Sequence, residues 1–245
     1  METGTRVRKP VDYSDYYTGD EIDQAFIDYG IDPAILAQDD ENMEYLNLNS
    51  GNFLLTECYF EVDGEEYHVT AEPTDVEGDY YIVNFLNDLN VGQFMELWRD
   101  EESKTAIAAL MRHPGHMHEW LMIAALPTLK RMGIDFNRVK DVRTEITTDF
   151  QFVSEGQKWT HGANRGSALM HIYLKKKIED QAQRYEEDCD KALEELSEEP
   201  NPLEYLQRAL RDVRYTFFTN PNPGPNDGVD VAVPKALDDF INAEI

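Results

Sequence analysis

The chain has 245 residues, of which 41% are hydrophobic and 11% aromatic, and it carries a formal net charge of −27 at pH 7. This apolar content excludes a wholly disordered chain, which could not bury enough surface to offset its conformational entropy. No apolar run reaches the roughly 18 residues of a membrane-spanning helix, and the start does not read as a signal peptide. We therefore expect a protein made for the cytoplasm, with no membrane partner.

The charge is distributed unevenly along the chain. Residues 1–111 contain 26 acidic and 5 basic side chains, a net charge of −21, whereas residues 112–178 contain 11 basic and 6 acidic side chains, a net charge of +5. The acidic block could simply keep the protein soluble, could pack against the basic block, or could mimic a phosphate backbone that covers a basic site. The overall charge argues against direct nucleic-acid binding and favours basic partners.

The first half of the chain predicts an arm, a short helix and a small sheet. Residues 1–19 contain few aliphatic side chains and are expected to be extended, and a short helix follows and ends near Gly30. Residues 52–86 then contain three strand-like segments, NFLLTECYFEV, EYHVTAE and DYYIVNFL. Asp63-Gly64 lies between the first two and is a strong hairpin signal. We expect a small antiparallel meander.

From Asn90 onward the pattern is mainly helical. The segments VGQFMELW and KTAIAALM predict one or two helices, HMHEWLMIAALPTLKRMG another, and FNRVKDV a short one. EITTDFQFV predicts a strand, and a polar loop, GQKWTHGANRGS, leads to Ser167. Ser167 is expected to cap a long helix from Ala168 to about Glu198, and a further helix is expected from Leu203 to Val213.

Taken together, these patterns predict an α+β fold. A small antiparallel β-meander in the N-terminal half precedes a mainly helical C-terminal half with one long helix. Four parts are expected: an extended arm (1–19), an acidic α+β domain (20–111), a mainly α-helical domain (112–218), and a Pro/Gly/Asn-rich linker with a short terminal helix (219–245). That amphipathic end is expected to dock either on its own body or on a neighbour.

Histidine is scarce but clustered in this chain. Five of the six histidines lie within 59 residues, namely His113, His116, His118, His161 and His171. Histidine is the commonest metal ligand and general base near neutral pH. If a helix began near Pro114, His116 and Glu119 would share one face and could hold a metal, and His118 would point elsewhere. His171 lies three residues before Leu174 and seven before Ile178, on the apolar face expected for the long helix. A hydrogen-bonded core histidine is therefore an alternative there.

The loop THGANRGS predicts a second kind of site, for an anion. Gly162 and Gly166 would let backbone N–H groups approach the anion, and Arg165 would add a side-chain donor. Ser167 opens the helix, whose N-terminus favours negative charge. The spacing of a P-loop, GxxxxGK[ST], is absent.

Four short motifs occur in a recognisable order: HEWLM (118–122), RTEITTDFQF (143–152), THGANRGS (160–167) and MHIYL (170–174). This order resembles the C-terminal domains of some bacterial polymorphic toxins, which carry His-Glu-Trp, Arg-Thr before a strand, a His-Gly loop and a final Phe-His pair. The resemblance covers about a quarter of the chain. It implies a nuclease-like activity that uses His118, His161 and His171, with Glu119 and Arg143 beside them.

This sequence departs from the toxin pattern at three points. Met170 replaces the aromatic residue, Ile172-Tyr173 replaces the Asn-Glu that tends to follow the last histidine, and further chain follows the matching stretch.

Two functions are therefore predicted. The first is a structural or assembly protein of a large complex, most simply a virus particle (a phage head, neck or tail component), which contacts other subunits of a homo- or hetero-oligomer and needs no cofactor. The arm, the linker with its amphipathic end, the uneven charge and the lack of a complete catalytic motif favour it. The alternative is a metal-dependent nuclease in which His118, His161 and His171 hold a divalent ion and Glu119 activates water. The acidic N-terminal block would then inhibit the nuclease activity.

Overall fold

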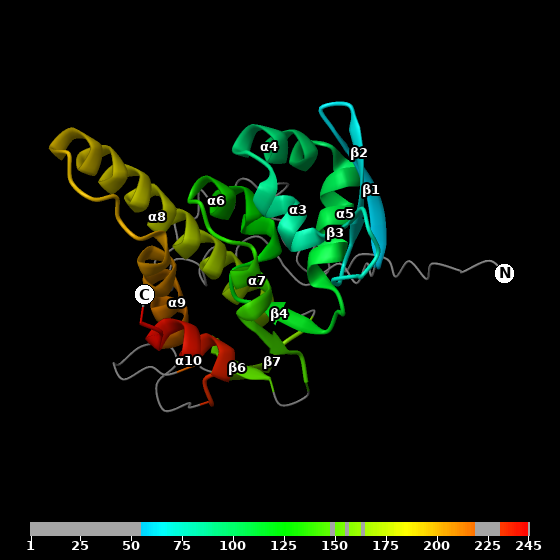
Figure 1. Cartoon of the computed structure of the whole chain (residues 1–245). Helices are drawn as coiled ribbons and strands as arrows, with labels where there is room; N and C mark the ends of the chain where they lie inside the picture. The colour runs from blue at the N-terminus through cyan, green and yellow to red at the C-terminus, as the bar shows by residue number, and fades with distance from the viewer. Residues whose placement is uncertain (1–54, 148–149, 155–156, 163–164, 219–230, 245) are drawn as a thin grey trace.

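The computed structural model describes residues 55–147, 150–154, 157–162, 165–218 and 231–244. The predicted arm, the predicted helix before Gly30 and the predicted linker lie outside these residues. The described part has the expected α+β fold, with small sheets and one long helix (Figure 1). No helix in it is both long enough and apolar enough to span a membrane.

The first sheet begins with the hairpin that Asp63-Gly64 predicts. Strands β1 (Glu57–Val62) and β2 (Glu65–Thr70) pair antiparallel, and both turn residues have left-handed backbones, with φ of 54° and 81°. A two-residue turn of this kind matches the twist of the strands that it joins. Strand β3 (Asp79–Tyr81) pairs with β2 in parallel, so the antiparallel prediction holds for the first two strands and is wrong for the third.

The third predicted strand is mostly helix. After β3 the chain continues directly as α3 (Ile82–Asp88). The buried side chains of this helix are Ile82, Val83, Phe85 and Leu86. This spacing fits one face of a helix and not the alternation of a strand, although their β-branched and aromatic character favoured a strand.

Two predicted helices, α4 (Val91–Arg99) and α5 (Glu101–Arg112), follow. Asn90 caps α4 by accepting a hydrogen bond from the Gln93 backbone N–H, and the Gln93 side chain accepts one from the Asn90 N–H. Asp100 caps α5 in the same way, through the Ser103 N–H. Such caps satisfy backbone donors that a helix leaves open at its start.

The helix predicted over residues 116–133 is wrong. The structure has a short strand, β4 (Met117–Glu119), then a 3-10 turn, η3 (Ile123–Ala125), and only then a helix, α6 (Leu126–Arg131). His116 and Met122 have left-handed backbones, with φ of 57° and 46°, which a right-handed helix excludes. The apolar run is buried on all sides, so its composition does not reveal a periodicity.

The predicted strand EITTDFQFV is split between two small sheets. Its first part contributes to β5 (Arg143–Glu145), which follows the short helix α7 (Asn137–Asp141) and pairs antiparallel with β4. Its second part is β6 (Gln151–Ser154), which pairs antiparallel with β7 (Gln157–Thr160). The loop predicted before the long helix therefore includes a strand.

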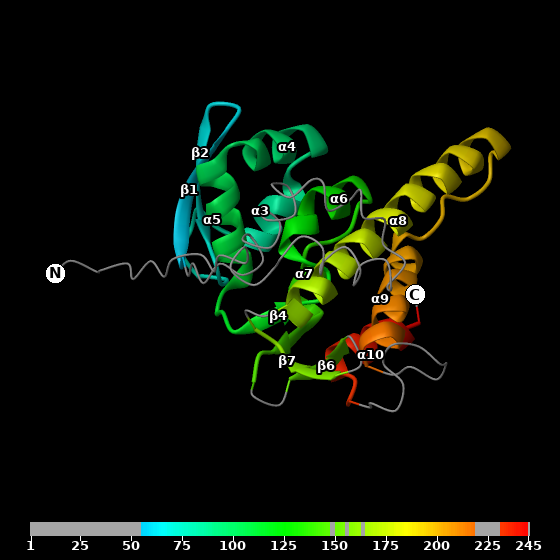
Figure 2. The same cartoon turned by 180° about the vertical axis from the view of Figure 1, so that it is seen from behind.

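The long helix α8 runs from Arg165 to Glu195, and α9 (Pro202–Phe217) and α10 (Lys235–Asn242) follow. Because α8 begins at Arg165, Ser167 lies inside its first turn, and the prediction that Ser167 is the cap is wrong. Helix α10 docks on its own chain: the Gln207 side-chain N–H groups donate to the carbonyls of Phe240 and Ala243, at 2.8 and 2.9 Å. Figures 1 and 2 show α8 crossing the molecule with α9 beside it, and α10 packed against α9.

One continuous hydrophobic cluster extends from Phe60 to Ile241 and includes residues of both predicted domains. Lysines of the basic block also join the two blocks by donating to backbone carbonyls of the acidic block. Lys130 donates to Leu86 and Asn87, and Lys140 donates to Ala71. The predicted domain boundary after residue 111 stays a prediction.

Candidate metal centre

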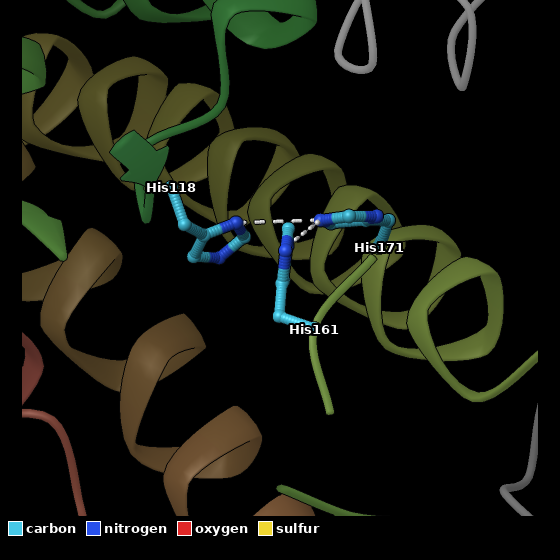
Figure 3. Close-up of side chains that lie close together, drawn as sticks. All are labelled: His118, His161 and His171. Atoms are coloured by element: carbon cyan, nitrogen blue, oxygen red, sulfur yellow. Dashed lines mark hydrogen bonds between the residues drawn. The ribbon is translucent and has the colours of Figure 1, made fainter. Parts of the chain in front are cut away.

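Three histidines from three separate segments come together beside the start of the long helix. His118 is the central residue of β4, His161 directly follows β7, and His171 lies in the second turn of α8. Figure 3 shows their three rings pointing toward one another. The structure therefore brings together the three histidines that the resemblance implies.

The ring nitrogens of these residues lie close together. Nε2 of His171 is 3.3 Å from Nε2 of His161 and 3.3 Å from Nδ1 of His118, and the three potential ligand atoms all lie within 4.8 Å of one another. A neutral ring nitrogen carries either one proton or one lone pair. His171 Nε2 therefore cannot donate in one of these contacts and accept in the other.

A single metal ion fits the same arrangement, because it accepts lone pairs from all three nitrogens. Histidine nitrogens lie about 2.0–2.1 Å from zinc in tetrahedral sites, which places two ligands about 3.4 Å apart. Two of the three nitrogen pairs already have this separation. The donor set fits Zn²⁺ or a similar transition metal, and it does not fit Mg²⁺ or Ca²⁺, which prefer oxygen ligands.

Local packing fixes two of the three rings. Just after β4, the Trp120 ring packs edge-on against the His118 ring, with centroids 4.3 Å apart, and the indole N–H donates to Thr144 of β5 at 2.8 Å. The His161 backbone N–H donates to the Phe150 carbonyl at 3.0 Å. The Phe150 ring stacks on the His161 ring, with centroids 5.0 Å apart.

Burial keeps all three imidazoles neutral at pH 7. His118 and His171 are only 4% and 6% exposed, and desolvation lowers the pKa of both well below 6.5. Desolvation also lowers the pKa of His161, to about 4. The positive charge of Arg112 lowers all three pKa values further. A neutral imidazole has the lone pair that metal coordination needs.

Two ring atoms of the cluster have no partner among the described residues. His118 Nε2 and His161 Nδ1 are buried and make no hydrogen bond to any of them. Buried polar atoms are nearly always satisfied, and a metal-bound histidine usually donates its second ring N–H to an acceptor. These two atoms mark places where a bound water or ligand would add stability.

Glu119 lies next to His118 but does not join the cluster. It is 3% exposed, and its nearest charged partner is Arg112, whose Nη2 is 3.7 Å from its Oε2. Successive side chains of a strand face opposite sides, and among the residues that the structure describes, the group close enough to hold an ion contains the three histidines without Glu119. Burial raises the pKa of Glu119, and Arg112 opposes that rise.

Arg143 holds the backbone around the site together. Its Nε donates to the Lys140 carbonyl at 2.6 Å, and its Nη1 donates to the His113 carbonyl at 3.1 Å. It sits on β5 opposite Glu119. These bonds join the turn after α5 to the segment before β5. Arg143 therefore helps to hold β4, which carries His118, in place beside β5.

The predicted pairing of His116 with Glu119 is wrong, because the helix that would place them on one face does not form. His116 is exposed, with a left-handed backbone, whereas Glu119 is buried. His113 also lies apart from the cluster and contacts Glu72, with Nδ1 3.1 Å from the carboxylate. Helical spacing therefore predicted His116 as the metal-binding histidine of this segment, whereas the structure places His118 in the cluster.

The residues predicted to bind an anion have other contacts. The Gly162 N–H donates to the Ser167 hydroxyl at 3.0 Å. Gly166 packs against the Trp159 ring so closely that a Cβ would lie 2.5 Å from ring carbons, which accounts for the glycine. The Arg165 side chain lies outside the described part of the structure. The anion site stays a prediction.

Sequence reasoning missed Arg112 and Phe150. Arg112 stands at the end of α5 and acts electrostatically on every histidine of the cluster, and Phe150 stacks on one of them. The only sequence signal for Arg112 is its place at the start of the basic block.

Comparison with known proteins gives no relative from which a function could be transferred: no family model, no curated protein and no solved structure matches this chain.

Proposed function

We propose that this chain is a metal-dependent hydrolase of the nuclease type, with a divalent transition-metal ion held by His118, His161 and His171. One observation carries the proposal: three neutral ring nitrogens converge from segments far apart in the chain, with two separations of 3.3 Å. Core histidines that serve only packing have no reason to gather with three ring nitrogens facing one another. The nuclease class comes from the resemblance to the toxin domains.

The roles of the chain's own residues follow from this geometry. A bound ion would supply Lewis acidity, which polarises a substrate oxygen or lowers the pKa of a coordinated water. Three protein ligands leave the fourth tetrahedral position for water or substrate, as catalytic zinc sites do. The Trp120 and Phe150 rings pack against His118 and exclude solvent on their side.

The charge around the cluster supports an anionic substrate. The three ligands are neutral, Arg112 adds a positive charge, and no carboxylate among the residues described raises the pKa of His118, His161 or His171. An ion at this place would make the region strongly positive, which favours a phosphate group. The surrounding net charge of −27 repels nucleic acid at a distance, and we propose that the acidic N-terminal block limits access.

The test combines metal content with cleavage. The full chain is purified as the wild type and as His161→Ala, and each protein is loaded with Zn²⁺, Co²⁺ or Mn²⁺ and desalted. Its bound metal is then measured, and its cleavage of DNA and RNA is assayed. We expect one equivalent in the wild type and at least a tenfold loss of affinity in the variant. His116→Asn is the matched control, because this exposed histidine lies only two residues from His118. A wild type that binds no transition metal contradicts the proposal.

A role in assembly, the first function predicted from the sequence, is favoured by a different observation. Leu193 and Leu196, near the end of α8, are 75% and 92% exposed, although large aliphatic side chains are usually buried. Mass photometry of the full chain tests self-assembly directly. A stable monomer that keeps every activity counts against a homo-oligomer. The virus particle as the site of assembly stays a prediction.

A further inference from the structure

The far end of α8 projects beyond the rest of the molecule. Helix α9 begins beside the last third of α8, where the Tyr205 ring packs against Tyr185 at 5.5 Å and its hydroxyl donates to Asp188 at 2.7 Å. Beyond this point α8 continues to Glu195, and both views show this part extending away from the body (Figures 1 and 2). We call residues 186–199 the acidic tip.

The acidic tip is a well-defined structure. The Tyr185 hydroxyl donates to the Glu199 carboxylate at 3.0 Å, so the segment that follows α8 is tied back onto the helix. The Ser197 N–H donates to the Ala192 carbonyl at 2.9 Å and closes the end of the helix. A surface that is already ordered loses little conformational entropy when a partner binds.

Two leucines face solvent on this tip. Leu193 and Leu196 are three residues apart and are the two most exposed of the large hydrophobic residues described. Leu196 also has a left-handed backbone, with φ of 53°. Glycine or asparagine is the usual residue at such a helix end, because the Cβ of most other residues is strained there. The strain and the exposure both lower stability, and no burial within the described part of the chain offsets them.

The charge of the acidic tip defines the kind of partner. Eight of its fourteen residues are acidic and only Lys191 is basic. Most of these acidic side chains are exposed, including Asp190, Glu194, Glu195 and Glu198. Such a surface repels nucleic acid, anionic membranes and the same tip of a second copy. It complements a segment that combines positive charge with apolar side chains.

We propose that the acidic tip is a docking surface for a basic amphipathic segment of another protein, with Leu193 and Leu196 as its apolar anchors. The acidic side chains around them contact the basic residues of the partner and select against anionic ones. This inference deepens the assembly role and is independent of the metal centre. It accounts for a strained, exposed leucine that the fold itself does not need.

The experiment measures binding of the full chain to two fluorescently labelled peptides of about 18 residues. One peptide is an amphipathic Lys/Leu helix and the other is its Glu/Leu counterpart. Binding is followed by fluorescence anisotropy at about 150 mM salt. We expect the Lys/Leu peptide to bind and the Glu/Leu peptide not to bind. In Leu193→Asn/Leu196→Gly, which keeps every charge, we expect affinity to fall about tenfold or more. Val76→Asn changes another exposed residue, on the loop after β2, and should bind as the wild type does.

Leu196→Gly alone separates docking from folding. This change relieves the left-handed strain, so the melting temperature should rise while peptide affinity falls. Equal peptide affinity in the wild type and the leucine variants would overturn the proposal, because charge alone would then explain binding. Equal binding of the Glu/Leu peptide, or no binding of the Lys/Leu peptide, would also overturn it. So would an oligomer of this chain that Leu193→Asn/Leu196→Gly disperses, because the occupant would then be a second copy.

Discussion

Nε2 of His171 lies 3.3 Å from Nδ1 of His118, although 53 residues separate the two in the chain. One residue comes from a long helix and the other from a three-residue strand. Their distance therefore depends on the packing of the whole domain, and a metal ion bound between them would stabilise that packing in turn.

The first prediction concerns this coupling. Saturating Zn²⁺ should raise the melting temperature of the wild type, because a ligand that binds only the folded state stabilises it by about 2.7 kcal/mol at one hundred times its dissociation constant. His171→Asn, which removes one of the three ligands, should lose most of this gain. Differential scanning calorimetry with and without EDTA measures it. A gain of the same size in His171→Asn would show that the ion binds elsewhere.

The second prediction concerns pH. The pKa of each of the three histidines is lowered in the folded state, so below about pH 6.5 the unfolded chain takes up protons that the folded chain excludes. The metal-free protein should therefore lose stability as the pH falls from about 6.5 toward 4, the pKa of His161. Urea unfolding at several pH values measures the slope, which should be smaller in His161→Gln. An unchanged slope in that variant would contradict the assignment.

The third prediction separates Glu119 from the metal ligands. Glu119→Gln should leave the affinity for Zn²⁺ within about threefold, because its carboxylate lies beside Arg112 and outside the histidine group. The substitution should still lower the free energy of unfolding by about 1–3 kcal/mol, because the Arg112 guanidinium loses the negative charge of Glu119. Isothermal titration and thermal unfolding give the two values. A tenfold loss of zinc affinity would make Glu119 part of the metal site.

The fourth prediction concerns the start of α8. Gly166→Ala should destabilise the protein by about 1–3 kcal/mol, because the new methyl group would overlap the Trp159 ring. The double variant Gly166→Ala/Trp159→Leu should recover part of the loss relative to Trp159→Leu alone. A double-mutant cycle by urea unfolding tests this coupling. Simple additivity would mean that the ring moves aside freely.

The fifth prediction concerns the terminal helix. Gln207→Ala removes two hydrogen bonds to the carbonyls of Phe240 and Ala243, and should cost about 1–3 kcal/mol of docking stability. Hydrogen exchange should become faster in residues 235–242 and remain unchanged in β1 and β2. Arg208→Ala is the control, because its side chain, on the same helix, pairs with Glu204 and not with α10.

Local signals predicted the parts of the fold that local interactions determine. Asp63-Gly64 marked the first hairpin, and the long helix was recognisable from apolar residues that recur every three or four positions. The segment after His116 was not predictable in this way, because an apolar run buried on every side has no periodicity that distinguishes helix from strand. The pairing of β4 with β5 then decides its conformation, and that pairing is a tertiary contact.

The candidate site was predictable only in part. The resemblance to toxin domains named His118, His161 and His171, whereas helical spacing favoured His116 with Glu119. The spacing failed because His118 is on a strand, where it faces away from its neighbour Glu119. Arg112 could not be predicted, because its influence on the histidines depends on where α5 ends in space.

One continuous helix carries both His171 and Leu193. Twenty-two residues separate them, which at about 1.5 Å per residue is about 33 Å of nearly rigid rod. Each degree by which the rod pivots about His171 moves its far end by about 0.6 Å, by simple leverage along this length. A tilt of α8 caused by an ion at His171 would therefore produce its largest displacement at the opposite end of the helix.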